Sequence, residues 1–151
     1  MKNYKNAFTM IELVFVIVIL GILAAVAIPK LIATRTDAEI SKVADNIMTG
    51  AGEIASYAMS NAKTENDLKL MSKGMKVLES SGYATLTTKK AVIAMGSVSN
   101  CLTLEILTGT TDDNLTISLG TAGNDTKCLA LQSAIDAAKY PMKLRGTNVT
   151  Y

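Results

Sequence analysis

The chain of 151 residues is 49% hydrophobic, contains few aromatic residues and no histidine, and has a formal charge of +2. The missing histidine excludes Ser-His-Asp and Cys-His catalysis and the usual zinc sites, and so small a charge does not favour nucleic acid as a partner. The length allows one small domain beside a membrane segment.

The first predicted element is a nearly unbroken apolar run over residues 7–31, AFTMIELVFVIVILGILAAVAIPKL. Residues 8–28 hold fourteen Phe, Ile, Leu and Val side chains, each of which favours insertion into a bilayer by about 0.3–0.6 kcal/mol. As a helix, this stretch is about 32 Å long, which is enough to cross the hydrocarbon core. The run therefore predicts a single membrane span.

Glu12 is the one acidic residue in this run. A lone carboxylate costs roughly 2.5–3.5 kcal/mol at the centre of a bilayer and less near its edge, so the run can insert with Glu12 in place. The nearby sequence offers no partner on the same helix. We therefore expect the partner of Glu12 to come from another molecule or from a free chain terminus.

A short polar leader, residues 1–7, precedes the run and carries Lys2 and Lys5. Two lysines before an apolar span favour a cytoplasmic leader and an outward-facing remainder. Ala7 is the small residue at the polar-to-apolar junction, and cleavage after it would leave the span attached to a chain that starts at Phe8. The leader lysines account for the whole formal charge, so the cleaved chain is neutral.

The sequence AFTMIE followed by an apolar helix resembles the processing site of type IV pilins and of the pseudopilins of type II secretion systems. The resemblance implies that a prepilin peptidase cuts between Ala7 and Phe8 and methylates the new amino terminus. Ala7 stands where most members have glycine. Glu12 matches the family's glutamate, and Gly21 and Pro29 match its helix-breaking positions, where the helix bends and can extend under load.

Electrostatics gives Glu12 an assembly role in such a filament. After cleavage, the amine of Phe8 would lie about one helical turn from Glu12, and the amine of an incoming subunit could neutralise the Glu12 of its neighbour. An unpaired charge in an apolar core costs several kcal/mol, whereas a pair costs much less, so a subunit docked one step wrong is disfavoured. The alternative is an ordinary single-span anchor in which Glu12 is incidental.

Helix-breaking residues interrupt the predicted helix at two places. Pro29 lacks an N–H and clashes with the preceding turn, so we expect a kink or local melting between Gly21 and Pro29, or else the end of the span at the membrane surface. Gly50 and Gly52 weaken the helix further along. They are interpreted as close-packing points against the rest of the protein or as a soft spot.

Beyond Pro29, over residues 29–61, the helical pattern becomes amphipathic. Polar residues such as Lys42, Asp45 and Glu53 occupy one side. The other side carries apolar residues at helical spacing, namely Ile40, Val43, Ala44, Ile47, Ala51, Ile54, Ala55 and Ala58. This half of the helix is expected to lie against an apolar surface.

The remaining residues, 62–151, predict a small α+β head. A short helix or helix-rich loop is expected over residues 64–79, followed by extended stretches over 83–88 and 91–95. Alternating residues over 101–107 and 115–119 predict a hairpin, residues 128–138 a helix, and residues 143–151 a terminal strand. The predicted fold is a long N-terminal helix, with a transmembrane half (8–28) and an amphipathic half (29–61), packed on a small antiparallel β-sheet, as in type IV pilins.

Two cysteines, Cys101 and Cys128, lie outside the cytoplasm in the predicted topology, where disulfides persist. A bond between them is favoured and would be similar to the C-terminal disulfide of pilins; two free buried thiols are the alternative. The acidic residues Asp112, Asp113 and Asp125 are interpreted as turn residues, although some pseudopilins bind calcium in the head. No cofactor and no metal site are expected.

Together these features predict a structural subunit of a type IV pilus or a type II secretion pseudopilus, and not an enzyme. The resemblance implies a homo-polymer or a mixed filament with other pilins, and as further partners the prepilin peptidase, an inner-membrane platform protein and an assembly ATPase. The subunit would span the inner membrane with its head in the periplasm before it joins the filament. The cysteine pair favours a pilus and the small head a pseudopilus. The alternative is an uncleaved, membrane-anchored periplasmic binding module.

Overall fold

The computed structural model of the chain describes residues 9–109 and 112–145. Helix α1, Met10–Asn61, is continuous over 52 residues and contributes to two units that divide between Ala38 and Glu39. The leader, with Ala7 and Phe8, lies outside the described residues, as does the end of the predicted terminal strand. Gly21 and Pro29 lie inside the helix. The structure therefore shows no melted turn between them, and a break under load stays a prediction.

The first unit consists of the N-terminal part of α1. Every residue from position 10 to 35 is exposed, and the most apolar window has a mean hydropathy of 3.1 with none of its residues buried. By length and composition this helix can cross a membrane. A helix that is apolar on all sides needs lipid or another protein around it, because water does not solvate such a surface well.

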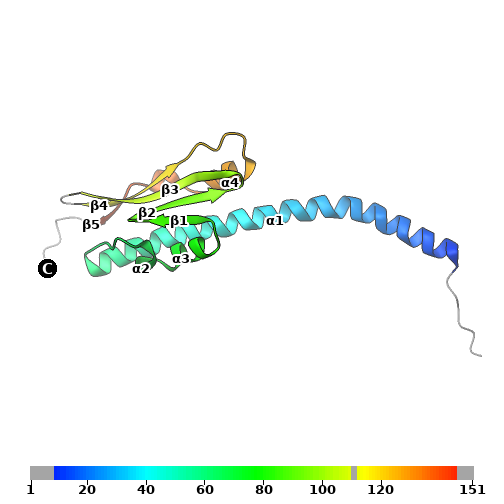
Figure 1. Ribbon diagram of the computed structural model, residues 1–151, viewed down its shortest axis with the longest axis horizontal. Coiled ribbons are helices and arrows are strands. Elements are labelled where there is room, and N and C mark those ends of the chain that lie inside the picture. Colours follow the sequence, from blue (N-terminus) through cyan, green and yellow to red (C-terminus); the bar gives the residue numbers. More distant parts are fainter. Residues whose placement is uncertain (1–8, 110–111, 146–151) are drawn as a thin grey trace, which may run out of the picture. The chain divides into compact units, whose positions relative to one another are not determined.

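The second unit is an α+β head, as the sequence predicts. After α1 come two short helices, α2 (Leu68–Met71) and α3 (Lys73–Ser80), then β1 (Ala84–Thr87), β2 (Lys90–Met95), β3 (Val98–Thr108) and β4 (Asp113–Leu119). Helix α4 (Thr126–Ala134), the 3-10 turn η1 (Ala137–Lys139) and strand β5 (Met142–Arg145) complete it. The five strands form one antiparallel sheet in the order β1-β2-β3-β4-β5, so each strand pairs with its neighbour in sequence (Figure 1).

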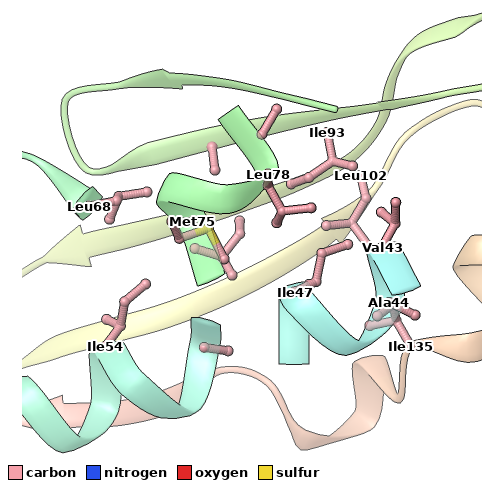
Figure 2. Close-up of a cluster of buried hydrophobic side chains, with 14 of the residues drawn as sticks. Val43, Ala44, Ile47, Ile54, Leu68, Met75, Leu78, Ile93, Leu102 and Ile135 are labelled. Atoms are coloured by element: carbon pink, nitrogen blue, oxygen red, sulfur yellow. The ribbon is translucent and has the colours of Figure 1, made fainter. Parts of the chain in front are cut away.

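The core of the head lies between α1 and the inner face of the sheet. All eight residues of the predicted apolar face of α1 are buried, which confirms the amphipathic half. Alternating strand residues such as Ile93 of β2 and Leu102 of β3 contribute the other side, and Figure 2 shows them close to Val43 and Ile47. The 3.6-residue period of the helix and the two-residue period of the strands thus bury the apolar side chains in one cluster.

Helices α1 and α3 cross at two glycines. A Cβ on Gly74 would lie 2.7 Å from the carbonyl oxygen of Asn46, and one on Gly50 would lie 2.5 Å from Cε of Met75. Gly50 is therefore a close-packing point, as one interpretation of the sequence held. Gly52 is not, because it is exposed and nothing lies within 4 Å of a Cβ there.

Glu53 strengthens the same crossing by capping α3. Its Oε2 accepts hydrogen bonds from the hydroxyl of Ser72 at 2.8 Å and from the N–H of Gly74 at 3.0 Å. The bond from the Gly74 N–H is the main cause that lowers the pKa of Glu53 below its usual value, against a smaller opposing effect of burial. A carboxylate at the start of a helix also interacts favourably with the helix dipole.

The predicted helix over residues 128–138 is too long. Helix α4 ends at Ala134, and Ile135 turns to an extended conformation that buries its side chain in the core. The side chain of Asp136 then accepts a hydrogen bond from the N–H of Ala138 and starts the separate turn η1. The prediction ran past the true end of α4 because Ile135 is apolar and lies at helical spacing, although its backbone is extended.

Candidate assembly site

Glu12 lies in the first turn of α1 and forms a capping box with Thr9. Oε2 of Glu12 accepts hydrogen bonds from the backbone N–H of Thr9 at 2.9 Å and from its hydroxyl at 2.7 Å. In return, the N–H of Glu12 donates to Oγ1 of Thr9 at 3.3 Å. This reciprocal pattern satisfies donors that a helix start leaves unpaired.

Thr9 is a partner that the sequence reasoning missed. The signal was present, because threonine followed three residues later by glutamate before an apolar run is the signature of a capping box. The expectation that the nearby helix offers Glu12 no partner is therefore wrong for neutral donors, although no lysine or arginine occurs between Thr9 and Pro29. The next cation, Lys30, is about 27 Å further along the helix at 1.5 Å per residue.

The surroundings of Glu12 are apolar and open. Met10, Ile11 and Phe15 are 83%, 76% and 67% exposed. Among the described residues, the hydrogen bonds to the Glu12 side chain all reach Oε2, so Oε1 can accept a bond from another chain. Ala7 and Phe8 lie outside the described residues, and the approach of the Phe8 amine to Glu12 stays a prediction.

The other predicted pair, Cys101 and Cys128, forms a disulfide with a Cα–Cα distance of 5.6 Å. Both residues are fully buried, and the alternative of two free thiols is wrong. The side-chain amide of Gln132 donates to the carbonyl oxygens of Cys101 at 2.7 Å and Gly120 at 2.9 Å. The disulfide therefore joins the first turn of α4 to strand β3 of the sheet.

Asp125 has a structural role in the same region. Its Oδ1 caps α4 through the N–H of Cys128 at 2.9 Å, and its Oδ2 accepts from the N–H and the hydroxyl of Ser97 at 2.8 and 2.7 Å. The backbone bond from Ser97, followed by that from Cys128, lowers the pKa of Asp125 to about 2. A Cβ on the nearby Gly96 would collide with this carboxylate, which explains a glycine there.

The remaining acidic candidates are also occupied by protein groups. Asp113 is buried, and its Oδ2 accepts from the hydroxyl of Thr64 at 2.8 Å. Asp112 lies 3.4 Å from the ammonium of Lys143. No group of three or more His, Cys, Asp or Glu side chains that could hold a metal occurs in the part of the chain that the structure describes.

Comparison with known proteins finds one family model and several relatives that match part of the chain. A family model for the prokaryotic N-terminal methylation motif matches residues 2–28. The chain is 31% identical over 70 residues to the type II secretion system core protein G of Klebsiella pneumoniae, a match that covers 44% of this chain and 50% of the relative. It is 30% identical over 63 residues to the protein of that name in Dickeya chrysanthemi, with 42% and 41% covered.

The chain thus spans about half the length of the curated relatives it matches. No solved structure matches it significantly. The methylation motif and the two relatives support the pilin and pseudopilin family, in agreement with the resemblance of the N-terminal residues.

Proposed function

We propose that this chain belongs to the pilin and pseudopilin family and is a structural subunit of a pseudopilus, which polymerises through the apolar part of α1. The observation that carries the proposal is the exposed apolar helix over residues 10–35 with the single carboxylate of Glu12 in its first turn. Such a surface is stable only when lipid or other subunits cover it. The names of the relatives favour a pseudopilus over a long type IV pilus.

Processing precedes assembly in this proposal. The prepilin peptidase removes residues 1–7, and Phe8 becomes the methylated amino terminus. The parts of the chain are then the span over residues 8–28, the amphipathic half over 29–61 and the head over 62–151. Before assembly, the subunit spans the inner membrane with its head in the periplasm. A platform protein and an assembly ATPase then insert it into the filament.

Glu12 selects the register of each new subunit. In the isolated chain, Thr9 satisfies Oε2 with two neutral hydrogen bonds, which lowers the cost of a carboxylate close to the bilayer. In the filament, the cationic amine of a neighbouring Phe8 neutralises the charge. Neutral donors such as Thr9 compensate the buried charge of Glu12 only in part, so pairing with the cationic amine lowers its free energy further. Only the correct register brings the amine to Glu12, and that register is therefore favoured.

N-terminal sequencing and intact mass of the protein from its native membrane, with the peptidase present, test the proposal first. We expect a chain that begins at methylated Phe8. A chain that still begins at Met1 would contradict the proposal and favour the alternative, an uncleaved membrane-anchored binding module.

A pair of variants then separates charge from capping at Glu12. Glu12→Gln keeps an oxygen that can accept from Thr9 but removes the charge, whereas Glu12→Ala removes both. We expect both variants to insert into the membrane and both to lose filaments, because each lacks the charge that pairs with the amine. Normal filaments from Glu12→Gln would show that only the capping box matters.

A further inference from the structure

We propose that Lys30 and Arg35, just beyond the apolar run of α1, bind the phosphate groups of anionic phospholipids. The inference rests on the proposed function in one respect, because it requires the run to lie in a bilayer before assembly. It adds a ligand class and two residues that the assembly role of Glu12 does not involve.

The two side chains are available for such a ligand. Both residues are exposed. Within residues 9–109 and 112–145, neither side chain takes part in a hydrogen bond or an ion pair, and the carbonyl oxygen of Lys30 alone accepts a bond, from the hydroxyl of Thr34 at 3.0 Å. The guanidinium and the ammonium are therefore accessible to an external group.

Their depth matches the headgroup layer. Beyond Ile28, where the apolar span ends, Lys30 lies about 3 Å and Arg35 about 10 Å further along the helix axis at 1.5 Å per residue. The headgroup layer on each side of the hydrocarbon core is roughly 5–8 Å thick. Long basic side chains reach several ångströms along the helix, so both cations can meet lipid phosphates. The first acidic residue, Asp37, lies about 13 Å beyond the span.

Their directions favour lipid over a single protein surface. Five residues at 3.6 per turn separate the two side chains by about 140° around the helix. One docked protein could contact one of them closely but not both, whereas lipid headgroups surround the helix on all sides.

Cleavage of the leader increases the importance of this pair. Once residues 1–7 are removed, Lys30 and Arg35 are the first basic residues of the chain. Cations on the outward side of a span oppose the usual preference for positive charge on the cytoplasmic side. Attraction to anionic lipid explains why the two cations occur at this depth, and it would hold the subunit at a fixed depth before extraction into a filament.

Lipid selectivity of the full chain measures the interaction directly. The protein is reconstituted in phosphatidylcholine vesicles with a minority of phosphatidylglycerol, and spin-labelled versions of the two lipids report which one contacts the helix. We expect a preference for phosphatidylglycerol of about fivefold, which falls at high salt. Lys30→Gln with Arg35→Gln should reduce the preference to near one.

Lys42→Gln is the matched control, because Lys42 is also exposed on α1 but belongs to the head and not to the membrane-spanning unit. It should keep the preference. An equal preference in the wild type and the double variant, or none in the wild type, would overturn the proposal. So would a double variant that keeps the preference but forms no filaments, since the cations would then serve a neighbouring subunit.

Insertion into pure phosphatidylcholine vesicles is measured in parallel. A chain that inserts there without any lipid preference contradicts this inference alone and leaves the proposed function standing. A chain that does not insert contradicts the membrane span itself, and the lipid assignment fails with it.

Discussion

The two halves of α1 have the same backbone conformation but different surroundings. Residues 10–35 are exposed without exception, while the half from Glu39 to Asn61 buries one complete face in the head. The difference lies in the pattern: apolar residues surround the first half and occupy one face of the second. Stability of the head should therefore depend on the second half alone, whereas partners outside the chain should depend on the first.

The same substitution of isoleucine by alanine in the two halves of α1 should give the largest difference in the stability of the head. Ile47 is fully buried, whereas Ile17 is 57% exposed. We expect Ile47→Ala to lower the free energy of unfolding of the head by about 2–5 kcal/mol, because it leaves a cavity in the core. Ile17→Ala should leave that free energy unchanged. Urea unfolding of the full chain in detergent, followed by tyrosine fluorescence, measures both, and equal effects would contradict the comparison.

The disulfide sharpens the same contrast, because both of its cysteines belong to the head. Cys101 and Cys128 are 27 residues apart in sequence, and replacing both by alanine should destabilise the head by about 3–4 kcal/mol on the chain-entropy model. Membrane insertion of the first half should not change. Unfolding curves with and without a reductant provide the control, because reductant should affect the wild type but not the double variant.

Glycine-to-alanine substitutions at and near the crossing of α1 and α3 should change the stability of the head in opposite directions. Gly74→Ala places a Cβ against the backbone of Asn46, which cannot move away easily, and should destabilise the head by about 1–3 kcal/mol. Gly52→Ala meets open space and should stabilise the helix by up to about 1 kcal/mol. Thermal unfolding of the two variants tests this, and a stabilising Gly74→Ala would show that the two helices can separate there at little cost.

Local patterns were sufficient to predict α1, the β3–β4 hairpin and the apolar face of the helix, because each has a clear period. The end of α4 was missed, since Ile135 fits a helical spacing although its backbone is extended. Contacts between distant segments were also beyond local patterns. Gly50 meets Gly74, and Asp125 meets Ser97, only because the fold brings them together. The capping box of Thr9 was local and could have been recognised.

Acid should weaken the head through Asp125, and this is the smallest of the expected effects. Its pKa is lowered to about 2 in the folded protein by bonds from Ser97 and Cys128. A carboxylate whose folded pKa lies below the unfolded value of about 3.9 stabilises the fold above that value and loses the contribution as the pH falls towards 2. Asp125→Asn can still cap α4, because asparagine is also a favoured capping residue.

That variant has no charge at position 125 to titrate, so its stability should change less than that of the wild type between pH 4 and pH 2. Urea unfolding across this range compares the two proteins. Asp136→Asn is the control, because Asp136 is also a capping aspartate but accepts one backbone bond at 3.2 Å and none from Ser97. If both variants flatten the pH dependence equally, the link between Asp125 and the β2–β3 turn contributes nothing special to the acid stability of the head.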